Sequence, residues 1–266
     1  MSSPPVAVVR EVPKRGQGAW QTYTVATEEG VTGEAVAATG EEKWEPLRIN
    51  VSYENLEDGK YCKDKDDKVM NYWTGNDKVQ CREVDLMKTD KKNELIKKIL
   101  PEAIKLHTDR LLVKRVKTPL NELTFENKEV CSRFAIPKEV DGDKLKVDEV
   151  KLSEADFLLY VASGSSGDKD PASFALTCAV DAESKRPIIG AMHVKAEVIK
   201  FGRSIVRLLA HELGHALGFD YKRMLDLNMT AVHNIRGENR TVVNSTNVLK
   251  KAKEHYNCDT MEGVEL

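Results

Sequence analysis

The chain has 266 residues, of which 41% are hydrophobic and 32% are charged, and its formal net charge is −2 at pH 7. This length and apolar content predict one large folded domain or two small ones. The balanced charge argues against a nucleic-acid partner. The sequence contains no run of about 18 apolar residues, so no segment of it is expected to span a membrane.

Residues 1–43 are expected to pack poorly, because the stretch 27–40 is rich in Gly, Glu and small residues. We interpret them as a linker or the end of a pro-segment. The alternating stretch from Pro46 to Tyr53 predicts the first strand. Turns are predicted at 58–60 and 75–77, around Cys62 and Cys81, which lie in a loop-rich stretch that a disulfide would staple. In a reducing compartment the two would instead be free thiols.

Residues 90–116 predict a helix, with apolar side chains mostly on one face and lysines on the other. Pro101 should kink this helix or split it in two. The lysines are interpreted as a solvated face. His107 has no partner motif and is interpreted as structural.

Three strands are predicted in the next part of the chain, at 155–162, 172–180 and 187–194. The loop 163–168 between the first two lacks the Gly-Lys-Ser/Thr ending of a phosphate-binding loop, so a nucleotide site is not expected there. His193 is interpreted as a strand residue near the cleft. A strand just before an active helix often borders the substrate, and we expect 188–194 to line the cleft as an edge that a peptide can extend.

The stretch from Ala196 to Phe219 predicts an apolar helix stopped by Gly218. It carries His211-Glu212-Leu213-Gly214-His215, the His-Glu-x-x-His pattern of zinc peptidases. Residues four apart share a helix face, so His211 and His215 can each give one nitrogen to a single Zn²⁺. Glu212 can then accept a proton from the zinc-bound water. The structural alternative is a core helix whose histidines are hydrogen-bonded.

A catalytic zinc needs a third protein ligand. The long metzincin pattern places a His at position 221, but this chain has Tyr221 there. A thermolysin-like scheme would use a Glu roughly twenty residues later, and Glu238 lies near that distance in what reads as a loop. His233 and His255 are the remaining candidates, and each is more often a surface residue.

The cysteines, the glycosylation sequons and the N-terminal residues point to different cellular compartments. Five scattered cysteines and four Asn-x-Ser/Thr sequons favour a secreted, disulfide-forming protein. The first residues lack the apolar core of a signal peptide, so either the chain is cytosolic or it is a piece of a longer secreted protein.

The sequence resembles the leishmanolysin family of trypanosomatid surface zinc metalloproteases over nearly its whole length. Seven ordered stretches carry the resemblance: Val9–Pro13, Gly16–Ala19, Trp44–Ile49, Leu106–Leu111, Tyr160–Ser163, His211–Phe219 and Ala252–Cys258. The resemblance implies an α+β fold, namely a zincin or metzincin-like N-terminal catalytic subdomain with a mixed sheet and an active-site helix that carries the His-Glu-x-x-His motif.

By this resemblance, His211 and His215 are ligands of one Zn²⁺ and Glu212 is the catalytic base. The chain is expected to divide into a pro-segment end (1–43), a metzincin-like catalytic subdomain (44–219) and a truncated insertion (220–266). The third zinc His, the Met-turn and any lipid anchor would follow Leu266, and the signal peptide would precede Met1. The resemblance also implies the disulfides Cys62–Cys81 and Cys131–Cys178, with Cys258 left without its mate.

The expected function is therefore that of a zinc-dependent metalloendopeptidase acting on peptides or proteins. The resemblance places it at the cell surface or outside the cell, with membrane attachment, if any, through a region outside this chain. The missing third His favours an alternative, a catalytically inactive surface or adhesion protein that keeps the fold.

Overall fold

The computed structural model describes residues 43–115, 123–136 and 154–266 with their side chains, and residues 7–10, 22–25, 140–141 and 144–145 by their backbone. Most of the predicted linker at 1–43 lies outside these ranges. Apart from Lys43, its described parts are strands β1 (Ala7–Arg10) and β2 (Thr22–Val25), which pair antiparallel. The boundaries expected at residues 43 and 219 stay predictions.

A mixed sheet forms the centre of the structure, in the strand order β4-β11-β13-β12-β8-β10-β9. Its strands are β4 (Ile49–Ser52), β8 (Leu123–Phe125), β9 (Val140–Asp141), β10 (Lys144–Leu145), β11 (Phe157–Ala162), β12 (Ser173–Asp181) and β13 (Pro187–Val194). Strands β4, β11 and β13 are parallel, whereas β12, β8, β10 and β9 pair antiparallel with their neighbours. The predicted mixed sheet in an α+β fold is confirmed.

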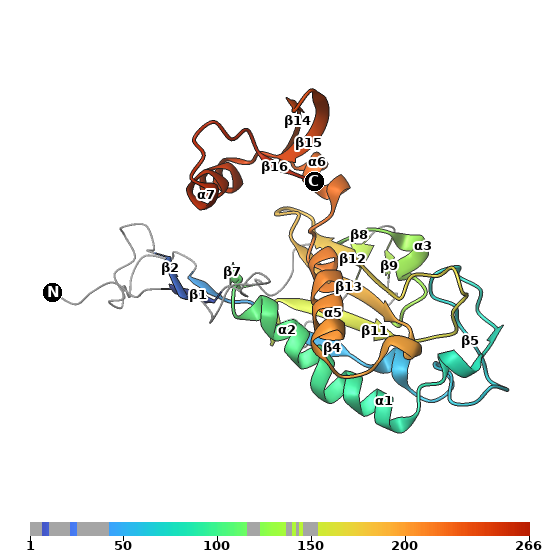
Figure 1. Ribbon diagram of the computed structural model, residues 1–266. Coiled ribbons are helices and arrows are strands. Elements are labelled where there is room, and N and C mark those ends of the chain that lie inside the picture. Colours follow the sequence, from blue (N-terminus) through green and yellow to red (C-terminus); the bar gives the residue numbers. More distant parts are fainter. Residues whose placement is uncertain are drawn as a thin grey trace.

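The central strands are buried on both faces, which explains their apolar sequences. Along β11, Phe157, Leu159 and Val161 face the helices in one core cluster, while Leu158 and Tyr160 belong to the core on the opposite face. Figure 1 shows helices α1, α2 and α5 in front of the sheet. The opposite core includes Phe134 and the cysteine of the short helix α3 (Lys128–Cys131).

The predicted helix at 90–116 is shorter than expected and is interrupted near Pro101. It consists of α1 (Thr89–Glu94), a π-helical turn (Leu95–Ile99) and α2 (Leu100–Thr108). Pro101 is the second residue of α2 and directly follows the π-helical turn, so the regular α-helical pattern breaks where a proline cannot donate an N–H. Residues 112–114 instead form strand β7 (Leu112–Lys114), because they pair with β3 (Trp44–Pro46).

The predicted strand 46–53 is split at Leu47 and Arg48, and its two parts join different sheets. The backbone N–H of Arg48 donates to Asp156 Oδ2 at 3.0 Å, and its guanidinium forms an ion pair with the same fully buried carboxylate at 3.1 Å. Arg115 contacts this carboxylate as well, at 2.6 Å. Two arginines thus compensate the buried charge of Asp156. Because the backbone N–H of Arg48 takes part, the predicted strand is interrupted at this residue.

Helix α5 (Arg203–Ala216) packs closely on the sheet because β13 has a glycine beneath it. A Cβ at Gly190 would lie 2.6 Å from the Phe157 ring and 2.9 Å from the Cβ of Ala216. The helix ends as predicted near Gly218, whose φ of +96° is in the left-handed region that favours glycine. Its N–H donates to the His215 carbonyl at 3.0 Å.

The last part of the chain forms a small unit that Figure 1 shows beyond the end of α5. Its elements are α6 (Tyr221–Asp226), β14 (Thr230–Ile235), β15 (Glu238–Val243), α7 (Thr246–Tyr256) and β16 (Val264–Glu265). The three strands form a separate antiparallel sheet in the order β14-β15-β16. Among the described residues, no helix combines the length and apolarity needed to cross a lipid bilayer.

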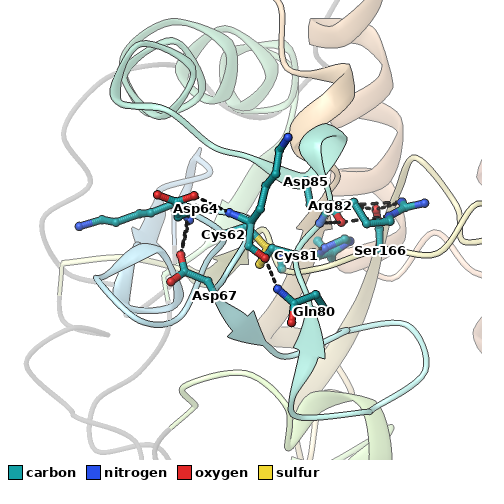
Figure 2. Close-up of a disulfide and its surroundings, with 12 residues drawn as sticks. Cys62, Asp64, Asp67, Gln80, Cys81, Arg82, Asp85 and Ser166 are labelled. Atoms are coloured by element: carbon teal, nitrogen blue, oxygen red, sulfur yellow. Dashed lines mark hydrogen bonds and ion pairs between the residues drawn. A yellow bond between two sulfur atoms is a disulfide. The ribbon is translucent and has the colours of Figure 1, made fainter.

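Both expected disulfides are present, Cys62–Cys81 and Cys131–Cys178, while Cys258 is a free, exposed cysteine. Figure 2 shows the first bond stapling a loop that also holds the short strands β5 (Lys68–Val69) and β6 (Val79–Gln80). Beside it, Asp85 binds Arg82 and accepts a 2.5 Å hydrogen bond from Ser166. These contacts tie the stapled loop to the loop that follows β11.

Candidate active site

The two histidines of the motif lie one turn apart on α5 and converge. Nε2 of His211 and Nε2 of His215 are 3.1 Å apart, and their rings are nearly perpendicular. Two nitrogens bound to one tetrahedral zinc at 2.0–2.1 Å would lie roughly 3.4 Å apart. The pair therefore fits two ligand positions of a zinc ion with only a small adjustment.

The imidazole of His215 is oriented by the end of its own helix. Its Nδ1 lies 2.8 Å from the carbonyl oxygen of Phe219, and because a carbonyl only accepts, this nitrogen carries the proton. The lone pair of the neutral ring is then on Nε2, the atom that faces His211. A backbone carbonyl that sets the tautomer in this way is a usual partner of metal-binding histidines.

Glu212 points from the buried side of α5 towards β12. Its side chain is 9% exposed, and its Oε1 accepts a hydrogen bond of 3.1 Å from the hydroxyl of Ser173. Glu212 and His215 both line a cleft of about 950 Å³. The carboxylate is therefore fixed by one oxygen while the residue borders open space.

The wall of this cleft is the first half of β12. Its lining includes Trp73, Pro171, Phe174, Ala175, Leu176, Thr177, Glu126 and Arg223. On one side β12 pairs with β13 along its length, but β8 reaches only Ala179–Asp181 on the other. In the described part of the chain, no strand pairs with that second side of residues 173–177. Among the described residues, the backbone of residues 173–176 therefore has no strand partner on the cleft side, whereas the carbonyl of Thr177 accepts a hydrogen bond of 2.8 Å from the side-chain amide of Asn127.

The expectation that 188–194 forms the edge of the cleft is wrong. These residues belong to β13, which lies between β11 and β12 and is buried throughout. His193 is only 2% exposed and its ring stacks between Tyr72 and Phe174, so it backs the cleft wall without reaching the cleft. Its Nε2 accepts a hydrogen bond from Gly164 N–H at 3.2 Å, and burial lowers its pKa to about 4.

The other candidate ligands lie elsewhere. Glu238 is the first residue of β15, not a loop residue, and its carboxylate binds Arg240 in a hairpin well separated from α5 in Figure 1. His233 lies in β14 and contacts Glu262 at 2.9 Å, and His255 is exposed on α7. His107 contacts α5 itself, with its Nε2 2.7 Å from the Ala210 carbonyl oxygen.

No third candidate metal ligand lies beside the histidine pair in the described part of the chain. Over residues 43–115, 123–136 and 154–266, no group of three His, Cys, Asp or Glu side chains is placed to hold a metal ion. Within these ranges, His211 and His215 therefore form a convergent pair with no third metal-binding side chain beside them.

Comparison with known proteins decides the family. The family model described as leishmanolysin matches residues 1–266. The chain belongs to the leishmanolysin family. It is 31% identical over 252 residues to leishmanolysin of Leishmania major, an alignment that covers 92% of this chain and 40% of that protein. It is 33% identical over 232 residues to a leishmanolysin homolog of Crithidia fasciculata, covering 84% and 33%. The chain thus spans about two fifths of the length of the Leishmania major protein.

The cleft-facing part of β12 was predicted from the sequence only as a strand, and not as part of the site. Ser173, Ala175 and Thr177 alternate with Phe174 and Leu176. The small and hydroxyl residues face α5, whereas the larger apolar ones join the core on the other face. This alternation was the available signal, because a helix can approach a strand closely only over small side chains.

Proposed function

We propose that this member of the leishmanolysin family is a zinc-dependent metalloendopeptidase with a metzincin-like catalytic core. The observation that supports it most is the convergence of His211 and His215 beside Glu212, at a cleft with a free strand edge. The proposed substrates are peptides or proteins, and by family resemblance the proposed location is the cell surface or the extracellular space.

In this proposal His211 and His215 hold the zinc through their Nε2 atoms, with His215 oriented by the Phe219 carbonyl. Zinc, when bound, acidifies water and polarises a carbonyl. Glu212 accepts the proton of the attacking water on its carboxylate and then delivers it to the leaving amine. Ser173 occupies Oε1, which leaves Oε2 as the oxygen for this proton.

The free edge of β12 provides the means to bind a peptide. An extended substrate can pair with the backbone of residues 173–176 as an added strand, which gives affinity through main-chain hydrogen bonds. Such pairing lays the peptide along α5, because Ser173 contacts Glu212 and Thr177 contacts the carbonyl of Ala216 at 3.0 Å. The scissile bond of the bound peptide then lies next to the Glu212 carboxylate and the histidine pair.

The direct test compares the full chain with its Glu212→Ala variant in a peptide-cleavage assay with added zinc. We expect the variant to lose at least a hundredfold in rate while it binds the same amount of zinc, because a general base contributes about 10²–10⁴-fold. Equal residual cleavage by both proteins would reject the catalytic role.

A second candidate function is supported by the same described residues. Because they supply two histidines and no third ligand, a non-catalytic surface or adhesion protein that keeps the fold is the alternative. Zinc content separates the two. Stoichiometric zinc in the wild-type protein together with Glu212-dependent cleavage supports the peptidase, and a zinc-free, inactive protein supports the alternative.

A further inference from the structure

Ser173, in strand β12, contacts the carboxylate of Glu212 through its side-chain hydroxyl. We propose that Ser173 is a positioning residue: by holding Oε1 it keeps Oε2 directed at the reacting water, and it couples the edge strand that binds substrate to the general base. This inference rests on the proposed peptidase function. It adds a residue that neither the zinc motif nor the histidine pair includes.

Ser173 is itself held rigidly. It is 6% exposed and is paired opposite Val194 in the β12–β13 ladder. The N–H of Lys195 donates to the carbonyl of the preceding residue, Ala172, at 2.9 Å. The hydroxyl therefore extends from a backbone that is fixed by strand pairing, and its 3.1 Å hydrogen bond to Glu212 joins β12 directly to α5.

The strand also explains why Ser173 can reach the helix. Side chains two apart on a strand share a face, so Ser173 and Thr177 both point towards α5. Thr177 Oγ1 donates to the carbonyl of Ala216 near the C-terminal end of the helix, at 3.0 Å. Two hydroxyl contacts, one turn apart on α5, thus set the position of the helix along the substrate-binding edge.

The chemical consequence concerns the orientation of the carboxylate. A Glu side chain has three rotatable bonds, and a buried carboxylate with one oxygen held by a hydrogen bond samples fewer orientations than a free one. A general base acts only when its oxygen is within hydrogen-bond reach of the proton it removes. Loss of the serine hydroxyl should therefore lower kcat, by about tenfold, and leave KM nearly unchanged, because the substrate pairs with the strand backbone.

The experiment uses the full chain with zinc and a fluorogenic peptide, and measures kcat and KM separately. We expect about a tenfold loss of kcat in Ser173→Ala and restoration of most of it in Ser173→Thr, which keeps the hydroxyl. The matched control is Ser166→Ala, which removes another buried serine that donates to a carboxylate, that of Asp85, outside the cleft. This control should keep the wild-type kcat.

A second readout needs no zinc and no activity. In the metal-free protein, urea unfolding of Ser173→Ala, Glu212→Ala and the double variant forms a double-mutant cycle. We expect the effects on the unfolding equilibrium constant to be coupled by at least about fivefold, as for a hydrogen bond to a charged group. An additive cycle overturns the inference.

The outcomes separate this inference from the function on which it rests. If the wild type shows no Glu212-dependent cleavage, the proposed function fails and the positioning role fails with it. If the wild type cleaves and Ser173→Ala has an unchanged kcat, only the positioning role is rejected. A loss of kcat in Ser166→Ala equal to that in Ser173→Ala also rejects it, because both effects would then reflect general destabilisation.

Discussion

Nε2 of His107, on α2, lies 2.7 Å from the carbonyl oxygen of Ala210, the residue that precedes His211 on α5. Since the carbonyl can only accept, His107 donates, and the bond joins two helices that Figure 1 shows side by side in front of the sheet. The ring also reaches Gly214, where its Cε1 would lie 4.0 Å from an added Cβ. The helix that carries the zinc motif is therefore braced from both neighbours, by α2 through His107 and by β12 through Ser173.

Replacing His107 should weaken this brace. We expect His107→Ala to lower the free energy of unfolding by about 1–2 kcal/mol, since it removes a partly buried hydrogen bond and its packing. Zinc affinity should fall as well, because the His211 backbone is less firmly held. Urea unfolding and zinc titration measure the two effects. His255→Ala, at an exposed position on α7, is the control, and an equal response in both variants would contradict the role given to His107.

Zinc should stabilise the protein through the histidine pair. A ligand present at 100 times its Kd adds about 2.7 kcal/mol to the free energy of unfolding. We expect a chelator to lower Tm and added zinc to restore it in the wild type and in Glu212→Gln. His211→Ala and His215→Ala should show no zinc-dependent shift. The measurement is Tm from thermal unfolding followed by circular dichroism. A zinc-dependent rise in Tm that persists in both histidine variants would show that the metal binds elsewhere.

The buried His193 should make the protein less stable in weak acid. Burial lowers its pKa to about 4 from 6.5, so the unfolded chain takes up a proton first as the pH falls. The stability that depends on neutral His193 is therefore complete above about pH 6.5 and is lost as the pH falls towards 4. Between pH 7 and pH 4.5 the wild type should lose roughly 2–3 kcal/mol more than His193→Gln, which cannot titrate.

The measurement is the free energy of unfolding in urea at each pH. Parallel losses in the wild type and in His193→Gln would show that other groups cause the acid sensitivity. Asp156, whose pKa is lowered, loses its contribution at a lower pH: burial alone would raise that pKa, but the hydrogen bonds from Arg48 and Arg115 outweigh burial. Because its contribution is lost only as the pH falls below the usual aspartate range, the two groups act in different pH windows.

The two disulfides should contribute unequally to stability. Cys62 and Cys81 are 19 residues apart, whereas Cys131 and Cys178 are 47 apart. In the chain-entropy description the shorter loop contributes about 3 kcal/mol and the longer one about 4 kcal/mol. We expect the variant with alanine at both 131 and 178 to unfold at a lower urea concentration than the variant with alanine at both 62 and 81. Cys258→Ser should match the wild type, and the reverse order of the two pairs would refute the prediction.

A side chain at Gly190 should push α5 away from the sheet. The Cβ of an alanine would collide with the Phe157 ring and with Ala216, and overpacking of this kind costs about 1–3 kcal/mol. We expect Gly190→Ala to be destabilised and to bind zinc more weakly, because the helix carries both proposed zinc ligands. Gly59→Ala is an informative control: its φ of +83° gives strain but its Cβ meets no atom within 4 Å, so it should lose stability without losing zinc affinity.

Local features of this protein were readable from the sequence. The four-residue spacing of His211 and His215 places them on one helix face in any α-helix, and Gly218 ends that helix because it adopts a left-handed conformation at little cost. The apolar run at 155–162 predicted a buried strand, and the stretch 187–194 predicted a strand, for a similarly local reason. These predictions depend only on residues that are close in the sequence, so they could be made without the tertiary fold.

Tertiary structure decided the features that depend on pairing between distant segments. Residues 112–114 became a strand because β3 was available to pair with them, and β12, not β13, became the edge of the cleft because β8 covers only its last residues. The hydrogen bond between Ser173 and Glu212 joins residues 39 apart in sequence. Helical periodicity and apolar patterning carry no information about strand order or register, so contacts of this kind emerge only when the sheet is assembled.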